Sequence, residues 1–227
     1  MTVSSVVSGL TPYSPPGPCW ATLVFAHGAG AGQRHPFMVQ TAEALASQGI
    51  AVTTFDFPYM AEGRRLPDRL PRLTEPFAEA VGAVHAAHPS LPVFVAGKSM
   101  GGRVATHLAA DPPLGLPALA GVIALGYPLT PPTARRPVDR VSHLQRLTRP
   151  LLVVQGTRDA FGSAEQVQDR LGAACSGPVT VVAVPEADHG FAVPARGRVT
   201  QQASTRDWQA ALVAWMRART GAAAPPQ

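Results

Sequence analysis

The sequence predicts an α/β fold: a mostly parallel sheet of about six to seven strands with helices on both faces. Short apolar runs rich in β-branched residues alternate with segments of helical periodicity, as in strand–helix–strand units. The runs are almost continuously apolar, which is typical of strands buried on both faces. A chain of 227 residues, 46% hydrophobic and 15% charged, is long and apolar enough for one buried core.

The elements expected from these patterns follow one another along the chain without an internal repeat. The strands are Thr22–His27, Ala51–Phe57, Val93–Gly97, Gly121–Gly126, Leu151–Gln155 and Val179–Val184. The helices are Phe37–Gln48, Leu73–Ala87, Ser99–Ala110, Val141–Leu147, Ala164–Ala174 and Thr205–Ala218. We expect one domain over residues 1–227. Residues 1–20 and 221–227 are expected to be loosely attached because of their Pro, Ser and Ala content.

The segment between the fourth and fifth expected strands limits what covers the sheet. Residues 128–140 form a loop rich in Pro and Arg. The whole stretch from Tyr127 to Arg149 is too short for a large helical cap, so we expect an open site above the sheet.

Composition argues against several classes of function. The net charge of +5 comes from scattered arginines with few aromatics, which disfavours nucleic-acid binding. No apolar run is long enough for a membrane span, and the N-terminus does not resemble a signal peptide. Cys19 and Cys175 do not make a disulfide framework. We therefore expect a cytoplasmic monomer or homodimer that binds neither nucleic acid nor membranes. We also expect no metal or organic cofactor, because the sequence has no Cys/His cluster with ligand spacing.

A serine between glycines stands where an expected strand becomes a helix. Ser99 lies in Gly-Lys-Ser-Met-Gly-Gly. The small residues Gly97 and Gly101 would permit a sharp, strained turn that exposes the serine as a nucleophile. The alternative is an ordinary tight turn. In the nucleophile interpretation, the N–H of Met100 at the start of the helix is one donor to a developing oxyanion.

The loop after the first strand, residues 27–32, reads His-Gly-Ala-Gly-Ala-Gly. Its small residues allow close approach of the backbone to a substrate, and we expect the Ala29 N–H to be the second oxyanion donor. A dinucleotide-binding loop is the rival interpretation. It is disfavoured because neither frame completes Gly-x-Gly-x-x-Gly: Gln33 and His35 stand at the last positions.

A general base and an orienting acid are expected after later strands. His189 is the histidine that follows the last strand, and Asp159 follows the strand before it. The order Ser99, Asp159, His189 is that of the α/β-type serine hydrolases. Asp56 and Asp188 stay open as alternative acids.

Aromatic and apolar side chains near the same strand ends are expected to line a substrate site: Tyr59, Met60, Tyr127, Phe161 and Phe191. Two basic features stay open. Arg64 and Arg65 either meet an acidic substrate or form a solvated pair. Lys98 either tunes the electrostatics of the turn or packs its stem beside the sheet.

Several motifs together resemble the α/β-hydrolase superfamily: AHGAGAG (26–32), HPFM (35–38), FDFPYM (55–60), GKSMGGR (97–103), LGYP (125–128) and QGTRDAFG (155–162). Within it, the chain is similar to the group around testis-expressed protein 30 and the hydrolase-like part of a chromatin-complex subunit, near the dienelactone hydrolases. The resemblance implies the fold and a triad of Ser99, Asp159 and His189.

These observations predict a serine hydrolase of small, soluble carboxylic esters that works through an acyl-enzyme. Two alternatives stay open: a non-catalytic interaction module on a hydrolase fold, and an acyltransferase that passes the acyl group to another acceptor.

Overall fold

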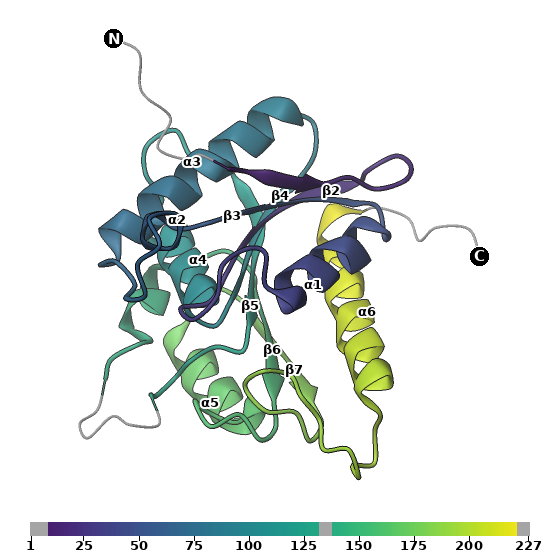
Figure 1. The fold of residues 1–227 in the computed structure, drawn as a ribbon. Coiled ribbons are helices and arrows are strands. Elements are labelled where there is room, and N and C mark those ends of the chain that lie inside the picture. Colours follow the sequence, from purple (N-terminus) through teal and green to yellow (C-terminus); the bar gives the residue numbers. More distant parts are fainter. Residues whose placement is uncertain (1–8, 132–137, 222–227) are drawn as a thin grey trace.

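The computed structural model describes residues 9–131 and 138–221, and these residues contain a seven-stranded sheet in the order β1-β3-β2-β4-β5-β6-β7 (Figure 1). The strands are β1 (Thr11–Tyr13), β2 (Ala21–Ala26), β3 (Ile50–Phe55), β4 (Val93–Lys98), β5 (Leu119–Leu125), β6 (Leu151–Gly156) and β7 (Val179–Val184). All neighbouring pairs are parallel except β1 with β3. The α/β-hydrolase fold expected from the sequence is confirmed.

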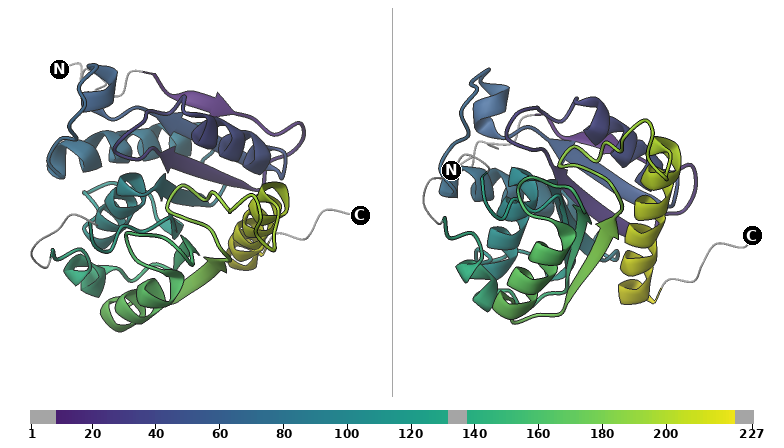
Figure 2. Two further views of the ribbon diagram at one scale, coloured as in Figure 1. Left: turned by 60° about the horizontal axis from the view of Figure 1, so that its bottom comes forward. Right: turned by 90° about the horizontal axis from the view of Figure 1, so that it is seen from below.

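Helices cover both faces of the sheet. They are α1 (Pro36–Ala46), α2 (Pro58–Ala61), α3 (Pro71–Ala87), α4 (Met100–Ala110), α5 (Ala164–Ala174) and α6 (Gln201–Thr220), with a 3-10 helix at Ser142–Arg146. Two apolar cores result: one lies beneath α3, α4 and α5, and the other beneath α1 and α6. The two views of Figure 2 show α6 on one side of the sheet and α4 and α5 on the other.

The structure departs from the expected elements in a few places. Residues 11–13 are not loosely attached, because they form β1 and pair antiparallel with β3. The helix expected over Val141–Leu147 is a shorter 3-10 helix, and α2 was not expected. Residues 132–137 of the expected Pro- and Arg-rich loop lie outside the described residues, as do residues 1–8 and 222–227. In the part of the loop that is described, nothing forms a large cap.

The register of the parallel strands brings their carboxyl ends to one edge. Ala26 of β2 is level with Gly97 of β4, and Lys98 of β4 is level with Leu125 of β5. Because each strand of this set ends at the same edge, the loops that follow the strands lie next to one another. Within the described residues, none of the helices has the length and apolar character required to cross a bilayer.

Candidate active site

Ser99 sits in a sharp turn between β4 and α4 with backbone angles of φ 51° and ψ −111°. This region of backbone space is unfavourable for a residue with a Cβ, so the surrounding structure must hold it. Gly97 and Gly101 make the turn possible. A Cβ on Gly101 would lie 2.6 Å from the carbonyl oxygens of Ala26 and His27, and a Cβ on Gly97 would collide with the Gly101 backbone. Glycine at these two positions therefore permits the strained turn.

Ser99, His189 and Asp159 form one chain of hydrogen bonds. Ser99 Oγ lies 2.8 Å from His189 Nε2, and His189 Nδ1 lies 2.7 Å from Asp159 Oδ2. The Asp159 side chain is buried, whereas the His189 side chain keeps 23% of its exposure. The three residues follow β4, β6 and β7, as the strand order predicts.

The Asp159 carboxylate is fixed by further donors. The Phe161 N–H donates to Oδ1 over 2.7 Å, and Gln155 Nε2 donates to Oδ2 over 2.9 Å. A carboxylate held on both oxygens can orient an imidazole without moving itself. Sequence reasoning missed Gln155. Its signal in the sequence was a polar residue at the end of the apolar run Leu-Leu-Val-Val-Gln, and the structure buries it fully.

The two alternative acids are engaged elsewhere. Asp56 accepts hydrogen bonds from the main chain and side chain of Gln33 over 2.7 and 3.2 Å. Asp188 Oδ1 accepts from the N–H groups of Gly190 and Ala192. Both carboxylates hold loops in shape, and Asp159 is the carboxylate that contacts His189.

The loop after β2 is oriented by His27. Its Nδ1 lies 2.7 Å from the Gly28 carbonyl oxygen, and its Nε2 accepts from the Phe57 N–H over 3.0 Å. Because Nε2 accepts, the ring is neutral and Nδ1 donates to Gly28. Burial lowers the pKa of His27, against smaller opposing effects of the Gly28 carbonyl and the Asp56 carboxylate.

Fixing the Gly28 carbonyl also fixes the next amide, because C=O and N–H point in opposite directions across a trans peptide. The Ala29 N–H is therefore directed away from the His27 ring. Tyr59 reinforces this arrangement: its hydroxyl donates to the Ala29 carbonyl over 3.0 Å. Burial raises the pKa of Tyr59 to about 12, with smaller contributions from Asp56 and Asp68. On the other side of Ser99, Met100 is the first residue of α4, where backbone N–H groups have no acceptor within the helix.

Three of the five side chains expected to line a substrate site are in the core. Tyr59 and Tyr127 are fully buried, and Phe191 is 3% exposed. The Tyr127 hydroxyl donates to the Arg140 carbonyl, and Phe191 packs on Phe37 and Trp208. Aromatic residues after a strand end also close the core, and these three do so here; their contact with substrate stays a prediction.

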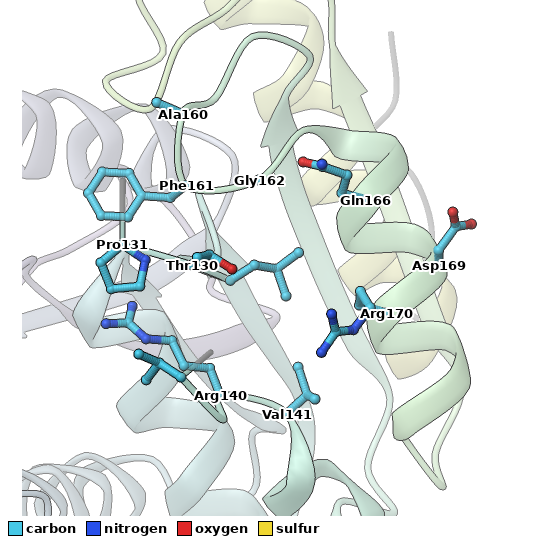
Figure 3. A pocket seen from close by; sticks show the side chains of 12 residues that line it. Thr130, Pro131, Arg140, Val141, Ala160, Phe161, Gly162, Gln166, Asp169 and Arg170 are labelled. Atoms are coloured by element: carbon cyan, nitrogen blue, oxygen red, sulfur yellow. The ribbon is translucent and has the colours of Figure 1, made fainter. Parts of the chain in front are cut away.

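The other two stay predictions as well. Met60 is partly buried against the core beneath α3. Phe161 packs its ring 4.2 Å from the His189 ring, centroid to centroid. Phe161 also lines a cavity of about 620 Å³ between the loops after β5 and β6 and helix α5. Figure 3 shows Phe161 and Arg140 on one side of this cavity and Gln166 and Arg170 on the other.

Among the described residues, no group of three or more His, Cys, Asp or Glu side chains is arranged to hold a metal ion. Burial raises the pKa of the Cys175 thiol, which disfavours its thiolate form. The groups that meet at the described site are the Ser99 hydroxyl, the His189 imidazole and the Asp159 carboxylate.

The comparison with protein families agrees with the fold. The family model for the alpha/beta hydrolase domain matches residues 20–217. The chain belongs to this family. No curated protein sequence matches the chain.

Solved structures of other hydrolases share the fold. A dienelactone hydrolase from Anabaena variabilis is 23% identical, with 96% of this chain and 95% of that chain covered and a TM-score of 0.72. A serine hydrolase without a lid from Xanthomonas campestris is 20% identical, with 96% and 90% covered and a TM-score of 0.68. An esterase from Thermogutta terrifontis, solved with butyrate bound, is 19% identical, with 96% and 91% covered and a TM-score of 0.66. At these identities the likeness shows the α/β-hydrolase fold.

Proposed function

We propose that this α/β hydrolase is a serine hydrolase of small carboxylic esters. One observation carries the proposal: a serine in a strained, glycine-supported turn is hydrogen-bonded to a histidine that a buried carboxylate orients. Backbone strain at a non-glycine residue is retained where function requires it. A structural serine has no need of this conformation.

The chemistry follows from the contacts. His189 Nε2 takes the Ser99 proton as Oγ attacks the ester carbonyl, and Asp159 holds the imidazole in the tautomer that leaves Nε2 free to accept. The Met100 and Ala29 amides donate to the oxyanion that develops, each worth about 3–4 kcal/mol. The imidazolium then protonates the leaving alcohol. An acyl group stays on Ser99 until water, deprotonated by His189, releases it.

Small substrates are favoured by the absence of a large cap in the described part of the chain. The cavity of about 620 Å³ beside Phe161 falls within the volume range of small-molecule sites, and the Phe161 ring links it to the His189 ring. Butyrate in the Thermogutta esterase supports a short acyl chain here as well. The proposal also retains four expectations: membership of the group around testis-expressed protein 30, a cytoplasmic location, a monomer or homodimer, and no partner among nucleic acids or membranes.

A fluorophosphonate probe with intact-mass and peptide analysis tests the nucleophile, with Ser99→Ala as control. We expect one adduct per chain, on Ser99. Folded protein without an adduct would instead favour a non-catalytic interaction module.

Turnover of p-nitrophenyl esters of graded chain length tests the substrate class. We expect the highest kcat/KM with short acyl chains and no rise in rate when a long-chain ester forms micelles. If the protein is an acyltransferase, added alcohols or amines should greatly increase the rate at which the acyl-enzyme turns over.

A further inference from the structure

Lys98 is the only lysine in the chain, and it directly precedes Ser99. It ends β4, and its side chain lies on the face of the sheet that α1 and α6 cover, opposite α4. The proposed mechanism gives it no step. A lysine is a costly residue at a strand end beside an apolar core, because its ammonium loses hydration there.

The ammonium has a specific partner. Lys98 Nζ donates to the main-chain carbonyl of His189 over 2.6 Å. It also lies 5.2 Å from the centre of the Phe191 ring and 5.8 Å from the centre of the Phe37 ring, within reach of cation–π attraction. Gly126, at φ +71°, leaves the space: a Cβ there would lie 2.9 Å from Nζ and 3.4 Å from the His189 ring.

We propose that Lys98 is a positioning residue for His189, tying the main chain of the histidine to the strand that carries the nucleophile. The inference rests on the proposed hydrolase function and adds a residue to its machinery. Lys98 and Ser99 are covalent neighbours, and both bond to His189. The Lys98 Nζ holds the His189 carbonyl, and the Ser99 Oγ bonds to the His189 Nε2, so the histidine is fixed to the nucleophile strand at its main chain and at its ring.

Other contacts hold the loop without reaching β4, among them the bond from the Arg158 N–H to the Ala187 carbonyl. Asp188 Oδ1 accepts from the N–H groups of Gly190 and Ala192, which holds the loop to itself. Gln201 bonds to the Phe191 carbonyl, which holds the loop to α6. Neither set reaches β4. Within the described residues, Lys98 supplies the direct hydrogen bond from β4 to the main chain of His189.

The tie is sensitive to pH. Burial lowers the pKa of Lys98 to about 8, while the carboxylates of Asp159 and Asp188 oppose this effect. These carboxylates and the His189 ring are the titratable groups that face the ammonium; α1 and the residue after Gly190 contribute the Phe37 and Phe191 rings. Because the charged form makes the stronger hydrogen bond, the hold on His189 weakens as the pH rises through about 8.

A single lysine makes the test direct. Protein with lysine labelled with ¹³C at Cε gives one Cε signal, which belongs to Lys98. We expect this signal to titrate near pH 8, and kcat for p-nitrophenyl acetate to fall over the same range. Lys98→Met should lower kcat at pH 7 by about 10- to 100-fold with little change in KM, and should lack the alkaline fall. Lys98→Arg, which stays charged, should move the fall to higher pH.

A folded Lys98→Met variant with kcat within about twofold of wild type would overturn the positioning role. A lysine signal that titrates near its ordinary pKa, or the same alkaline fall in wild type and variant, would overturn its pH dependence. A purely structural lysine would lower activity equally at every pH. If Lys98→Met does not fold, the wild-type NMR titration and Lys98→Arg decide. Fluorophosphonate labelling separates the two proposals: no adduct on wild-type Ser99 refutes the hydrolase itself, whereas equal labelling rates of wild type and Lys98→Met refute only the positioning role.

Discussion

The turn that carries the nucleophile, residues 97–102, and the loop that carries the histidine, residues 187–192, are joined through Ser99 Oγ and through Lys98 Nζ but are held in different ways. The turn is shaped by crowding of backbone against backbone, with Gly101 against the carbonyls of Ala26 and His27. The histidine loop is shaped by side chains that bond to its main chain, from Asp188, Lys98 and Gln201. The first region therefore depends on how closely backbone can approach its glycines, whereas the second depends on polar side chains that bond to its main chain.

The largest effect is expected where the two regions meet. Ser99→Ala removes the atom that attacks and leaves both loops in place, so kcat should fall by about a million-fold with little change in Tm. The rate of ester hydrolysis by the variant and by wild type measures the fall in kcat. Turnover within about tenfold of wild type would place the nucleophile elsewhere.

A smaller loss is expected from the acid that orients the base. Asp159→Asn keeps the shape of the carboxylate but offers a donor to His189 Nδ1, so the wrong tautomer is favoured and kcat should fall about 10⁴-fold. Asp56→Asn and Asp188→Asn are the matched controls. Each removes a carboxylate that bonds to main-chain N–H groups of a loop, so each should lose far less activity and more thermal stability. If Asp56→Asn or Asp188→Asn lost most of its activity while Asp159→Asn stayed active, the acid would have to be reassigned.

The same contrast decides what the sequence could predict. The strained turn follows from glycine spacing after an apolar strand, and the order of Ser99, Asp159 and His189 follows from strand order. The role of Gln155 and the contact from Lys98 to His189 span 4 and 91 residues and depend on where side chains point. Strand and helix patterns do not specify such contacts.

The missed elements have a similar cause. β1 is three residues long, contains Pro12, and gains its stability by pairing with the edge of β3. A run this short has no periodicity to detect. Likewise, Tyr59 and Tyr127 were expected at the substrate because they follow strand ends, yet their rings fill the core and their hydroxyls find main-chain carbonyls.

A pair of glycine substitutions compares the two regions directly. A methyl group on Gly101 would meet two backbone carbonyl oxygens at 2.6 Å, whereas one on Gly190 would meet the Asp188 carboxylate at 3.2 Å. Backbone cannot yield as a side chain can, so Gly101→Ala should cost about 1–3 kcal/mol or more of unfolding free energy. Gly190→Ala should cost less than about 1 kcal/mol. Urea unfolding checks both. Equal costs would show that the turn relaxes as easily as the loop.

The last prediction concerns His27, whose fully buried ring holds the loop after β2 by its bonds to Gly28 and Phe57. Burial lowers its pKa below the ordinary value of 6.5, so the folded chain keeps the ring neutral where the unfolded chain takes up a proton. This stability is complete above about pH 6.5 and declines as the pH falls, by at most about 1.4 kcal/mol per pH unit.

His107 and His143 add to this acid loss, because burial lowers their pKa values to about 3 and about 4. The matched variant His27→Asn keeps a short polar side chain that can donate to Gly28 but does not titrate. The unfolding free energy of this variant should therefore fall less steeply between pH 6.5 and 5 than that of wild type. The two slopes should differ by up to about 1.4 kcal/mol per pH unit, the value for one proton. Urea midpoints across this range measure the difference. Parallel slopes would mean that His27 is protonated in the folded protein, and that the loop with Ala29 is held by a cation bonded to Gly28 and Asp56 instead of by a neutral ring.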